Sequence, residues 1–292
     1  YASHRLSLLC INFGRKDRCA AAPDIPGPRL TYSEKNFQGE NEMLNGKCAL
    51  ITGSTSGIGL AYAKALAAEG CEIMMNGVAD ADTIDAAKAE VTAASAKAVH
   101  FSAADMRKPE EIRAMVADAT AAMGKVDILI NNAGIQHVSR IEDFPDDQWD
   151  DIIAINLSSS FHTIKAVLPQ MRERDWGRII NTSSVQGIVA SIHKAAYVSA
   201  KHGLVGLTKM VALETAESGI TCNAICPGST DTALSRWQTE KFARESGTTV
   251  EEASKNRLGE KQPSMTQVGV EQLGALAVFL CEDAASQMTG TA

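Results

Sequence analysis

The sequence contains no excess of basic residues, no apolar run of membrane-spanning length and no internal repeat. Its 292 residues include 28 Lys and Arg against 35 Asp and Glu, which gives a formal net charge of −7. A nucleic-acid-binding surface requires clustered positive charge, so this balance argues against such a partner. The absence of a run of about 20 apolar residues argues against a membrane span. We therefore expect a soluble protein that acts on a small molecule.

The cysteine pattern indicates neither a disulfide framework nor a metal site. The chain has seven cysteines, an odd number. They stand at positions 10, 19, 48, 71, 222, 226 and 281. Several fall within apolar runs, which predicts buried thiols in a reducing compartment, with the cytoplasm as the expected location. Cys222 and Cys226 form a close pair, but no further ligand stands near them, so core packing is favoured over metal binding.

Residues 1–42 differ in character from the rest of the chain. They begin without Met, mix basic residues with Pro and Gly, and show no sustained period of 2 or 3.6 residues. We expect this extension to lie outside the core. Two origins remain open: sequence upstream of a natural start at Met43, or a mitochondrial transit peptide, which would place the protein in the matrix.

From Met43 onward, short apolar runs alternate with longer segments of helical spacing. The runs predicted as strands are 47–53, 71–77, 97–105, 126–134, 177–184 and 221–228, and the clearest helical segments are 58–69, 108–123, 147–173 and 197–217. Most of the strands are apolar on both faces, which is typical of a parallel sheet covered by helices on each side. The alternation predicts one doubly wound α/β domain, a Rossmann fold, over residues 43–292.

Ligands of such sheets bind at the carboxyl ends of the strands, and the first of these turns is rich in glycine. The stretch TGSTSGIG, residues 52–59, follows a strand and opens a helix. Gly53, Gly57 and Gly59 permit a tight turn and the close approach of a pyrophosphate to the N-terminus of the helix. Glycine-rich turns also occur for structural reasons alone, but this setting favours dinucleotide binding.

Four motifs in register resemble the short-chain dehydrogenase/reductase family. They are TGSTSGIG, NNAG at 131–134, YVSAK at 197–201 with Ser184 before it, and Pro227-Gly228. The resemblance covers residues 44 to 290 and implies a nicotinamide dinucleotide cofactor. The residues that it implies for cofactor binding are Gly53, Thr55, Ser56, Gly57, Ile58, Gly59, Asp105, Asn132, Ala133, Gly134, Tyr197, Lys201, Pro227, Gly228 and Thr232.

Tyr197 and Lys201 stand one helical turn apart, so they lie on the same face of their helix. Oxidation of a secondary alcohol requires removal of the hydroxyl proton, and a phenol with a pKa of about 10 is a weak base at neutral pH. A neighbouring ammonium can favour the phenolate. Packing of Tyr197 in the core, with Lys201 extending to solvent, is the alternative, and Ser184 at a strand end counts against it.

The family resemblance implies a role for each of four catalytic residues. Ser184 is expected to hydrogen-bond the substrate oxygen, Tyr197 to exchange its proton, and Lys201 to bind the nicotinamide ribose as well. Asn156, in IAINLSS, corresponds to the residue that supports a proton path to the lysine. The complete set favours an enzyme over a dinucleotide-sensing protein without turnover.

The end of the second strand predicts NAD rather than NADP. An acidic residue there accepts hydrogen bonds from the ribose 2′-hydroxyl, whereas a basic residue accommodates the 2′-phosphate. Neither Arg nor Lys follows Asn76 and Gly77 in MNGVADAD. This also counts against a 3-oxoacyl-thioester reductase, the alternative within the family. Asp105 resembles the family residue that contacts adenine, and it could instead cap the helix over 108–123.

The segments around the catalytic residues resemble those of the dehydrogenases that act on short hydroxy acids. The resemblance implies a small hydroxy-acid substrate, contacted by Gln136, Ser184, Gln186, Lys194, Tyr197 and Gln238. A lysine near the catalytic tyrosine can supply the charge that an anion requires. Two departures weaken the match. Gln186 replaces a carboxylate-binding histidine, and Asp231 introduces an acid that could repel the substrate if it points inward.

Two further expectations concern the last third of the chain. Residues 229–264 form a long polar insertion, which predicts a lid over the site, although a solvated helix pair is the alternative. The sequence ends at MTGTA, where the family begins a last strand and a tail that contributes to tetramer contacts. We therefore expect a truncated final strand, an outer sheet edge with unpaired backbone groups, and a homotetramer in the full-length protein.

Overall fold

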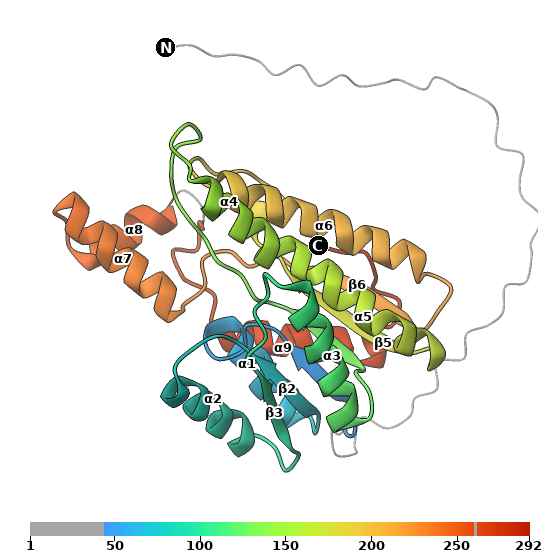
Figure 1. Cartoon of the computed structure of the whole chain (residues 1–292). Helices are drawn as coiled ribbons and strands as arrows, with labels where there is room; N and C mark the ends of the chain where they lie inside the picture. The colour runs from blue at the N-terminus through green and yellow to red at the C-terminus, as the bar shows by residue number, and fades with distance from the viewer. Residues whose placement is uncertain (1–43, 260–261) are drawn as a thin grey trace, which may run out of the picture. The chain divides into compact units, whose positions relative to one another are not determined.

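A computed structural model describes residues 44–259 and 262–292, which belong to one compact unit, Asn41–Ala292. The prediction for residues 1–42 lies outside the described residues. Six strands form one parallel sheet in the order β3-β2-β1-β4-β5-β6 (Figure 1). Their bounds are β1 Cys48–Ile51, β2 Glu72–Asn76, β3 Val99–Ser102, β4 Ile128–Asn131, β5 Gly177–Thr182 and β6 Ile220–Ile225. This order, with β1 beside β4, confirms the doubly wound fold.

Helices cover both faces of the sheet (Figure 1). They are α1 Gly57–Ala68, α2 Ala81–Ala93, α3 Pro109–Met123, α4 Asp146–Ile153, α5 Ser159–Glu173, α6 Ala195–Glu214, α7 Ala233–Ser246, α8 Val250–Gly259 and α9 Val270–Cys281. One buried cluster joins the sheet to α1, α2 and α9, and a second joins it to α3, α5 and α6. The four strands β1, β4, β5 and β6 are buried along their whole length, as expected for a parallel sheet between two helical layers.

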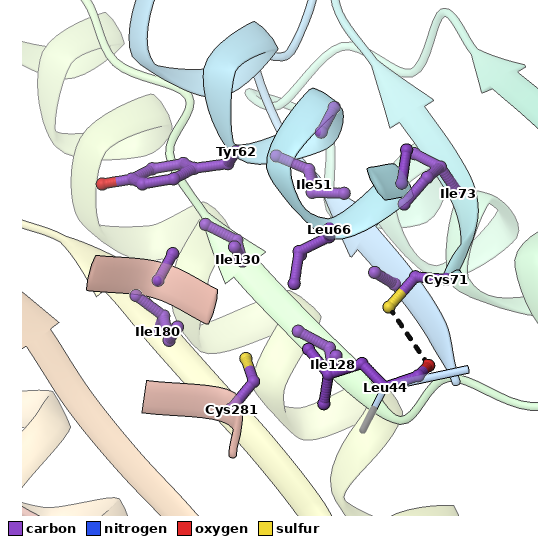
Figure 2. Packing of buried hydrophobic residues seen from close by; sticks show 14 of the residues in the cluster. Leu44, Ile51, Tyr62, Leu66, Cys71, Ile73, Ile128, Ile130, Ile180 and Cys281 are labelled. Atoms are coloured by element: carbon purple, nitrogen blue, oxygen red, sulfur yellow. Dashed lines mark hydrogen bonds between the residues drawn. The ribbon is translucent and has the colours of Figure 1, made fainter. Parts of the chain in front are cut away.

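The cluster under α1 shows how the first helix is held on the sheet (Figure 2). Tyr62 and Leu66 point from α1 onto the isoleucines of β1 and β4 and are fully buried. Burial of an apolar side chain of this size stabilises the folded protein by about 1.5–3 kcal/mol. Cys71 donates its thiol to the Leu44 carbonyl at 3.6 Å. The start of α1, where the glycine turn lies, is therefore fixed on a rigid support.

The predicted helix over 147–173 is interrupted by a π-helical turn. Residues Ala154–Ser158 separate α4 from α5, so the single helix of the prediction is wrong. Periodicity alone cannot reveal such a turn, because the chain stays helical through it. Turns of this kind are frequent at functional sites, and this one contains Asn156.

The outer edge of β6 carries hydrogen bonds from the residues at the end of the sequence. Gly290 donates its N–H to the Cys222 carbonyl at 2.8 Å, and Ala224 donates to the Thr291 carbonyl at 2.9 Å. The Asn223 amide also donates to the Met288 carbonyl at 2.6 Å. The expectation of an unpaired edge is therefore wrong for this stretch of β6, because the last residues turn back along it.

The described cysteines are free thiols, as predicted. Cys48, Cys71, Cys222 and Cys281 are buried, and Cys226 is half-buried. Burial raises the pKa of Cys48 to about 11 and that of Cys71 to about 12. No helix among residues 44–259 and 262–292 is long and apolar enough to cross a membrane.

Candidate active site

The glycine turn after β1 is held by polar groups from the neighbouring strand ends. The Ser54 N–H donates to the Asn76 carbonyl at 2.7 Å, and the Gly53 N–H donates to the Asn76 side chain at 3.3 Å. Gly53 and Gly57 have φ values of +62° and +54°, which disfavour any residue with a Cβ. The turn therefore needs glycine for its conformation.

The NNAG motif after β4 braces the same turn. Asn132 donates its side-chain amide to the carbonyls of Thr52 and Gly53 at 3.1 and 2.9 Å. In return, the Thr52 hydroxyl accepts the N–H groups of Asn132 and Ala133 at 2.9 and 3.1 Å. A Cβ on Gly53 would lie 2.7 Å from the Ala133 Cα. The two predicted cofactor motifs thus form one packed unit at the carboxyl end of the sheet.

Gly59→Ala tests this unit. A Cβ at Gly59 would meet the Gly53 carbonyl oxygen and lie 2.5 Å from the Asn132 amide, so both must shift. We expect at least a tenfold weaker affinity for the dinucleotide, equivalent to about 1.4 kcal/mol. The measurement is a fluorescence titration of the reduced cofactor. Gly206→Ala is the matched control, because nothing lies within 4 Å of its added Cβ. Unchanged affinity in Gly59→Ala would show that the turn does not hold the dinucleotide.

Asn76, at the end of β2, is fully engaged in the scaffold. Its side-chain amide donates to the carbonyls of Ser102 and Ala104 at 3.1 and 3.0 Å, while its side-chain oxygen accepts from Gly53. A buried amide with these partners is structural. Thr55 packs over the next residue, because a Cβ on Gly77 would lie 2.7 Å from its methyl group.

Asp105 does not cap α3. The N-cap position of α3 belongs to Lys108, and it makes no side-chain cap. The Asp105 carboxylate instead accepts hydrogen bonds from the Arg107 guanidinium and from the Arg107 backbone, which hold the pKa of that carboxyl below its usual range. The capping alternative is therefore wrong, and adenine contact stays a prediction.

Residues beyond β6 approach the glycine turn from the other side. The Pro227 carbonyl accepts from the Val185 N–H at 3.0 Å, which ties this turn to the segment after β5. Thr232 caps α7 through its hydroxyl, which accepts from the Ser235 N–H at 3.1 Å. Its methyl group lies 3.5 Å from where a Cβ on Gly57 would stand. The structure thus brings Thr232 beside the predicted pyrophosphate site.

Ser184, Tyr197 and Lys201 meet at the junction of β5 and α6. The Ser184 hydroxyl is near enough to the Tyr197 phenol to lower its pKa. The Lys201 ammonium lies 5.5 Å from the centre of the Tyr197 ring and donates to the Thr182 carbonyl at 2.7 Å. Lys201 is only 3% exposed, so the alternative in which it extends to solvent is excluded. The structure thus brings these three predicted residues together at the carboxyl end of β5.

Burial governs the ionisation of this group. It raises the pKa of Tyr197, and the hydrogen bond from Ser184 partly opposes that effect. Burial also lowers the pKa of Lys201 to about 8. Tyr197 therefore does not show the lowered pKa that the sequence argument implied. An ammonium beside the phenol is still the group that can offset the desolvation of a phenolate.

Asn156 lies in the π-helical turn, and its side chain contacts the loop after β4. Its side-chain oxygen accepts from the Ile135 N–H at 2.9 Å, and its amide donates to the Ile135 carbonyl at 2.9 Å. Both ends of the amide are engaged in this reciprocal pair, and the residue is buried. Asn156 thus fixes the residue that follows Gly134 of the NNAG motif.

One pair of predicted substrate residues meets in the structure, and a third predicted residue pairs with Ser191. Lys194 donates to the Gln136 side chain at 3.3 Å, so residues far apart in the sequence meet next to α6. Gln186 lies in the 3-10 turn Val185–Gly187 and donates to the Ser191 hydroxyl at 3.1 Å. Gln238 lies half-buried on α7.

Asp231 does not add an unpaired charge to the site. It is exposed and accepts from the Arg236 guanidinium at 2.5 Å. A paired carboxylate on the surface exerts little long-range repulsion. The hypothesis that it repels an anionic substrate is therefore not supported by its position.

Several residues that hold the site were not singled out by the sequence. Ser183 donates to the Lys201 carbonyl at 3.0 Å, and the Thr182 carbonyl accepts the Lys201 ammonium. Thr52 organises the NNAG motif through its hydroxyl. Each is a polar residue at the end of a buried strand, and that position is the signal that could have indicated them.

Comparison with known proteins agrees with this geometry. The family model described as short chain dehydrogenase matches residues 47–242. The chain is 56% identical over 249 residues to D-beta-hydroxybutyrate dehydrogenase of Cupriavidus necator, covering 85% of this chain and 95% of that protein. It is 51% identical to the protein of the same name from Rhizobium meliloti, covering 84% of this chain and 95% of that one.

The crystal structure of NAD+-bound xylitol dehydrogenase is similar, with a TM-score of 0.78 and 30% identity over 85% of this chain and 96% of that one. Motifs, site geometry and these similarities agree with one another. The chain is an oxidoreductase that belongs to the short-chain dehydrogenase family.

Proposed function

We propose that the protein catalyses the reversible oxidation of D-3-hydroxybutyrate to acetoacetate with NAD. The observation that carries the proposal is the junction of β5 and α6, where Ser184, Tyr197 and Lys201 meet and Lys194 lies beside Gln136. It combines a proton-transfer group with a cation suited to a carboxylate. The names of the two relatives described above support this substrate.

The residues at the glycine turn fit a dinucleotide without a 2′-phosphate. Gly53, Gly57 and Gly59 form a tight turn next to the N-terminus of α1, and a Cβ on Gly53 or Gly59 would collide with backbone of the turn or of the NNAG motif. The loop from Gly77 to α2 carries acidic Asp80 and no Arg or Lys. NAD supplies the hydride acceptor when bound, and this charge pattern favours it over NADP.

The chain's own residues then have distinct roles. Tyr197 accepts the hydroxyl proton of the substrate, and Ser184 orients the same oxygen. Lys201 supplies positive charge beside the phenol, and Asn156 holds the loop after β4 in place. This division follows general acid-base catalysis, in which geometry and the electrostatic environment of the base set the rate.

Lys194→Ala tests substrate recognition separately from chemistry. We expect the KM for D-3-hydroxybutyrate to rise about tenfold or more with kcat nearly unchanged, because Lys194 is half-buried and a charge-assisted hydrogen bond contributes about 1.5–3 kcal/mol. Steady-state kinetics at saturating NAD measure both constants. Lys209→Ala, at an exposed position on the same helix, is the control. A loss confined to kcat would contradict a binding role.

We also propose that residues 229–264 act as a lid. The helices α7 and α8 pack side by side (Figure 1) and present exposed Trp237 and Phe242. The base of the insertion is fixed: the Val268 N–H donates to the Ser229 carbonyl at 2.9 Å, and the Gln267 amide donates to the Ser235 hydroxyl at 2.9 Å. A pair of helices that closes over the site from a fixed base would exclude water during hydride transfer.

The outer faces of α5 and α6 support the proposal of a homotetramer. A cavity of about 370 Å³ between them is lined mainly by apolar side chains, including partly exposed Phe161 and Met210. Lys165, Arg172 and Glu214 also line it, and a second copy could pair these charges.

The described cysteines are free thiols, and this supports the proposal of a reducing compartment such as the cytoplasm.

Met210→Asp should weaken assembly through this face, because it places a charge in an apolar contact. We expect light scattering coupled to gel filtration to report a smaller species than for the unaltered protein. Val250→Asp, an exposed apolar position outside the cavity, serves as the control. An unchanged mass for Met210→Asp would show that α5 and α6 do not form the contact.

The function itself is tested with a panel of short D- and L-hydroxy acids, offered with NAD or NADP. Formation of the reduced cofactor is the readout. Selective turnover of D-3-hydroxybutyrate with NAD is expected. Turnover of other alcohols alone, or of 3-oxoacyl thioesters with NADPH, would retain the family chemistry and overturn the substrate.

A further inference from the structure

Gln186 lies next to Ser184 in the candidate site. It belongs to the turn Val185–Gly187, which packs against α6. Its N–H donates to the Ser184 hydroxyl at 3.1 Å, the same hydroxyl group that lowers the pKa of Tyr197. Its side chain is therefore attached two residues from the group that orients the substrate oxygen. Gln186 is 8% exposed, so its amide must be satisfied from within the protein or by a ligand.

Only one end of this amide has a partner among the described residues. The nitrogen donates to the Ser191 hydroxyl at 3.1 Å. The oxygen is shielded from solvent and accepts no hydrogen bond from residues 44–259 or 262–292. A buried acceptor without a partner costs about 1–3 kcal/mol. A group that binds beside Gln186 and provides a donor would recover part of this free energy.

The Gln186–Ser191 pair can present either end of the amide. A serine hydroxyl both donates and accepts, so the Gln186 side-chain amide can rotate by 180° and still hydrogen-bond Ser191. When the amide nitrogen bonds Ser191, the amide oxygen can accept from an N–H or O–H of a ligand. When the amide oxygen bonds Ser191, the amide nitrogen can donate to a carboxylate. Neither arrangement carries a net charge.

Positive charge comes from a different side chain. Lys194 follows Ser191 closely in the sequence and donates to Gln136 at 3.3 Å. Charge recognition is thus separate from the amide, whereas a histidine at position 186 would combine the two when protonated. A substrate therefore needs no negative charge at the contact with Gln186, because only Lys194 recognises charge.

We propose that Gln186 is a specificity-determining residue that lets the site take uncharged 3-hydroxy amides as well as 3-hydroxy acids. This inference rests on the proposed function. The reaction at the carbinol would be the same for both classes: Tyr197 would take the hydroxyl proton, and NAD, when bound, would supply the hydride acceptor. Only the terminal group differs, and its N–H satisfies the Gln186 oxygen.

The test compares D-3-hydroxybutyrate with D-3-hydroxybutyramide. We expect the unaltered enzyme to oxidise both, and Gln186→Leu to lower kcat/KM for the amide about tenfold, the effect of one lost hydrogen bond. Gln186→Glu keeps an acceptor of the same shape but adds negative charge. It should retain turnover of the amide and lose at least tenfold in kcat/KM for the acid. Gln287→Leu, at an exposed position, is the control.

The outcomes separate the two proposals. An unaltered enzyme that oxidises the acid but not the amide would overturn the inference, as would Gln186→Leu with unchanged kcat/KM for the amide. Turnover of neither substrate would overturn the proposed function instead. The KM for NAD and the melting temperature of each variant show that the fold and the cofactor site are intact.

Discussion

Tyr197→Phe is expected to lower kcat by about 10³-fold, because positioned acid-base groups contribute about 10²–10⁴-fold to such reactions. The change removes one oxygen atom and leaves the ring in place. The Ser184 hydroxyl loses a partner, but the ring keeps its position beside Lys201. Steady-state kinetics with D-3-hydroxybutyrate and NAD measure the loss.

Cofactor affinity is the control for this variant. The glycine turn and the NNAG motif do not depend on the phenol, so binding of the reduced dinucleotide should stay within a few-fold of normal. Retained turnover in Tyr197→Phe would exclude Tyr197 as the proton acceptor. Loss of both turnover and dinucleotide binding would point to a structural role.

Lys201→Met is expected to abolish most activity while making the folded protein more stable. Burial lowers the pKa of Lys201 from 10.5 to about 8 in the folded state. The unfolded chain therefore binds more protons between these two values, and stability rises with pH through that window. Below about pH 8, Lys201 is charged in the folded protein, and burial of its ammonium lowers the free energy of unfolding by the full amount. Methionine has similar length and carries no charge.

The free energy of unfolding at neutral pH is expected to rise by roughly 2 kcal/mol in Lys201→Met. This figure already subtracts about 1 kcal/mol for the lost hydrogen bond to the Thr182 carbonyl. Urea denaturation without added cofactor measures it. The unaltered protein should also become more stable as pH rises above about 8, and the variant should show less of this rise. A destabilised Lys201→Met would show that the ammonium is better accommodated than its burial implies.

The sheet, and the position of Tyr197 and Lys201 on one helix face, could be predicted because they depend on local patterns. Apolar runs such as those of β4 and β5 are buried on both faces, and a Tyr and a Lys four positions apart must share a helix face. The glycine turn is similarly local, since its positive φ values and close packing leave few alternatives to glycine.

The features that the sequence could not predict depend on contacts between distant segments. The π-helical turn at Asn156 is stabilised by Ile135, and the edge of β6 is paired by residues near position 290. Asp105 looked like a helix cap, but Arg107 engages its carboxylate. Burial likewise raises the pKa of Tyr197, whereas the helix spacing alone indicated only the neighbouring lysine.

The most direct test of the proposed function follows the hydrogen on the carbinol carbon. D-3-hydroxybutyrate carrying deuterium at that carbon is incubated with the protein and NAD, and the reduced cofactor is analysed by mass spectrometry. We predict that one deuterium is recovered on the nicotinamide, and that Tyr197→Phe suppresses its transfer. Acetoacetate formed without deuterium on the nicotinamide, or no acetoacetate at all, would contradict the proposed hydride transfer.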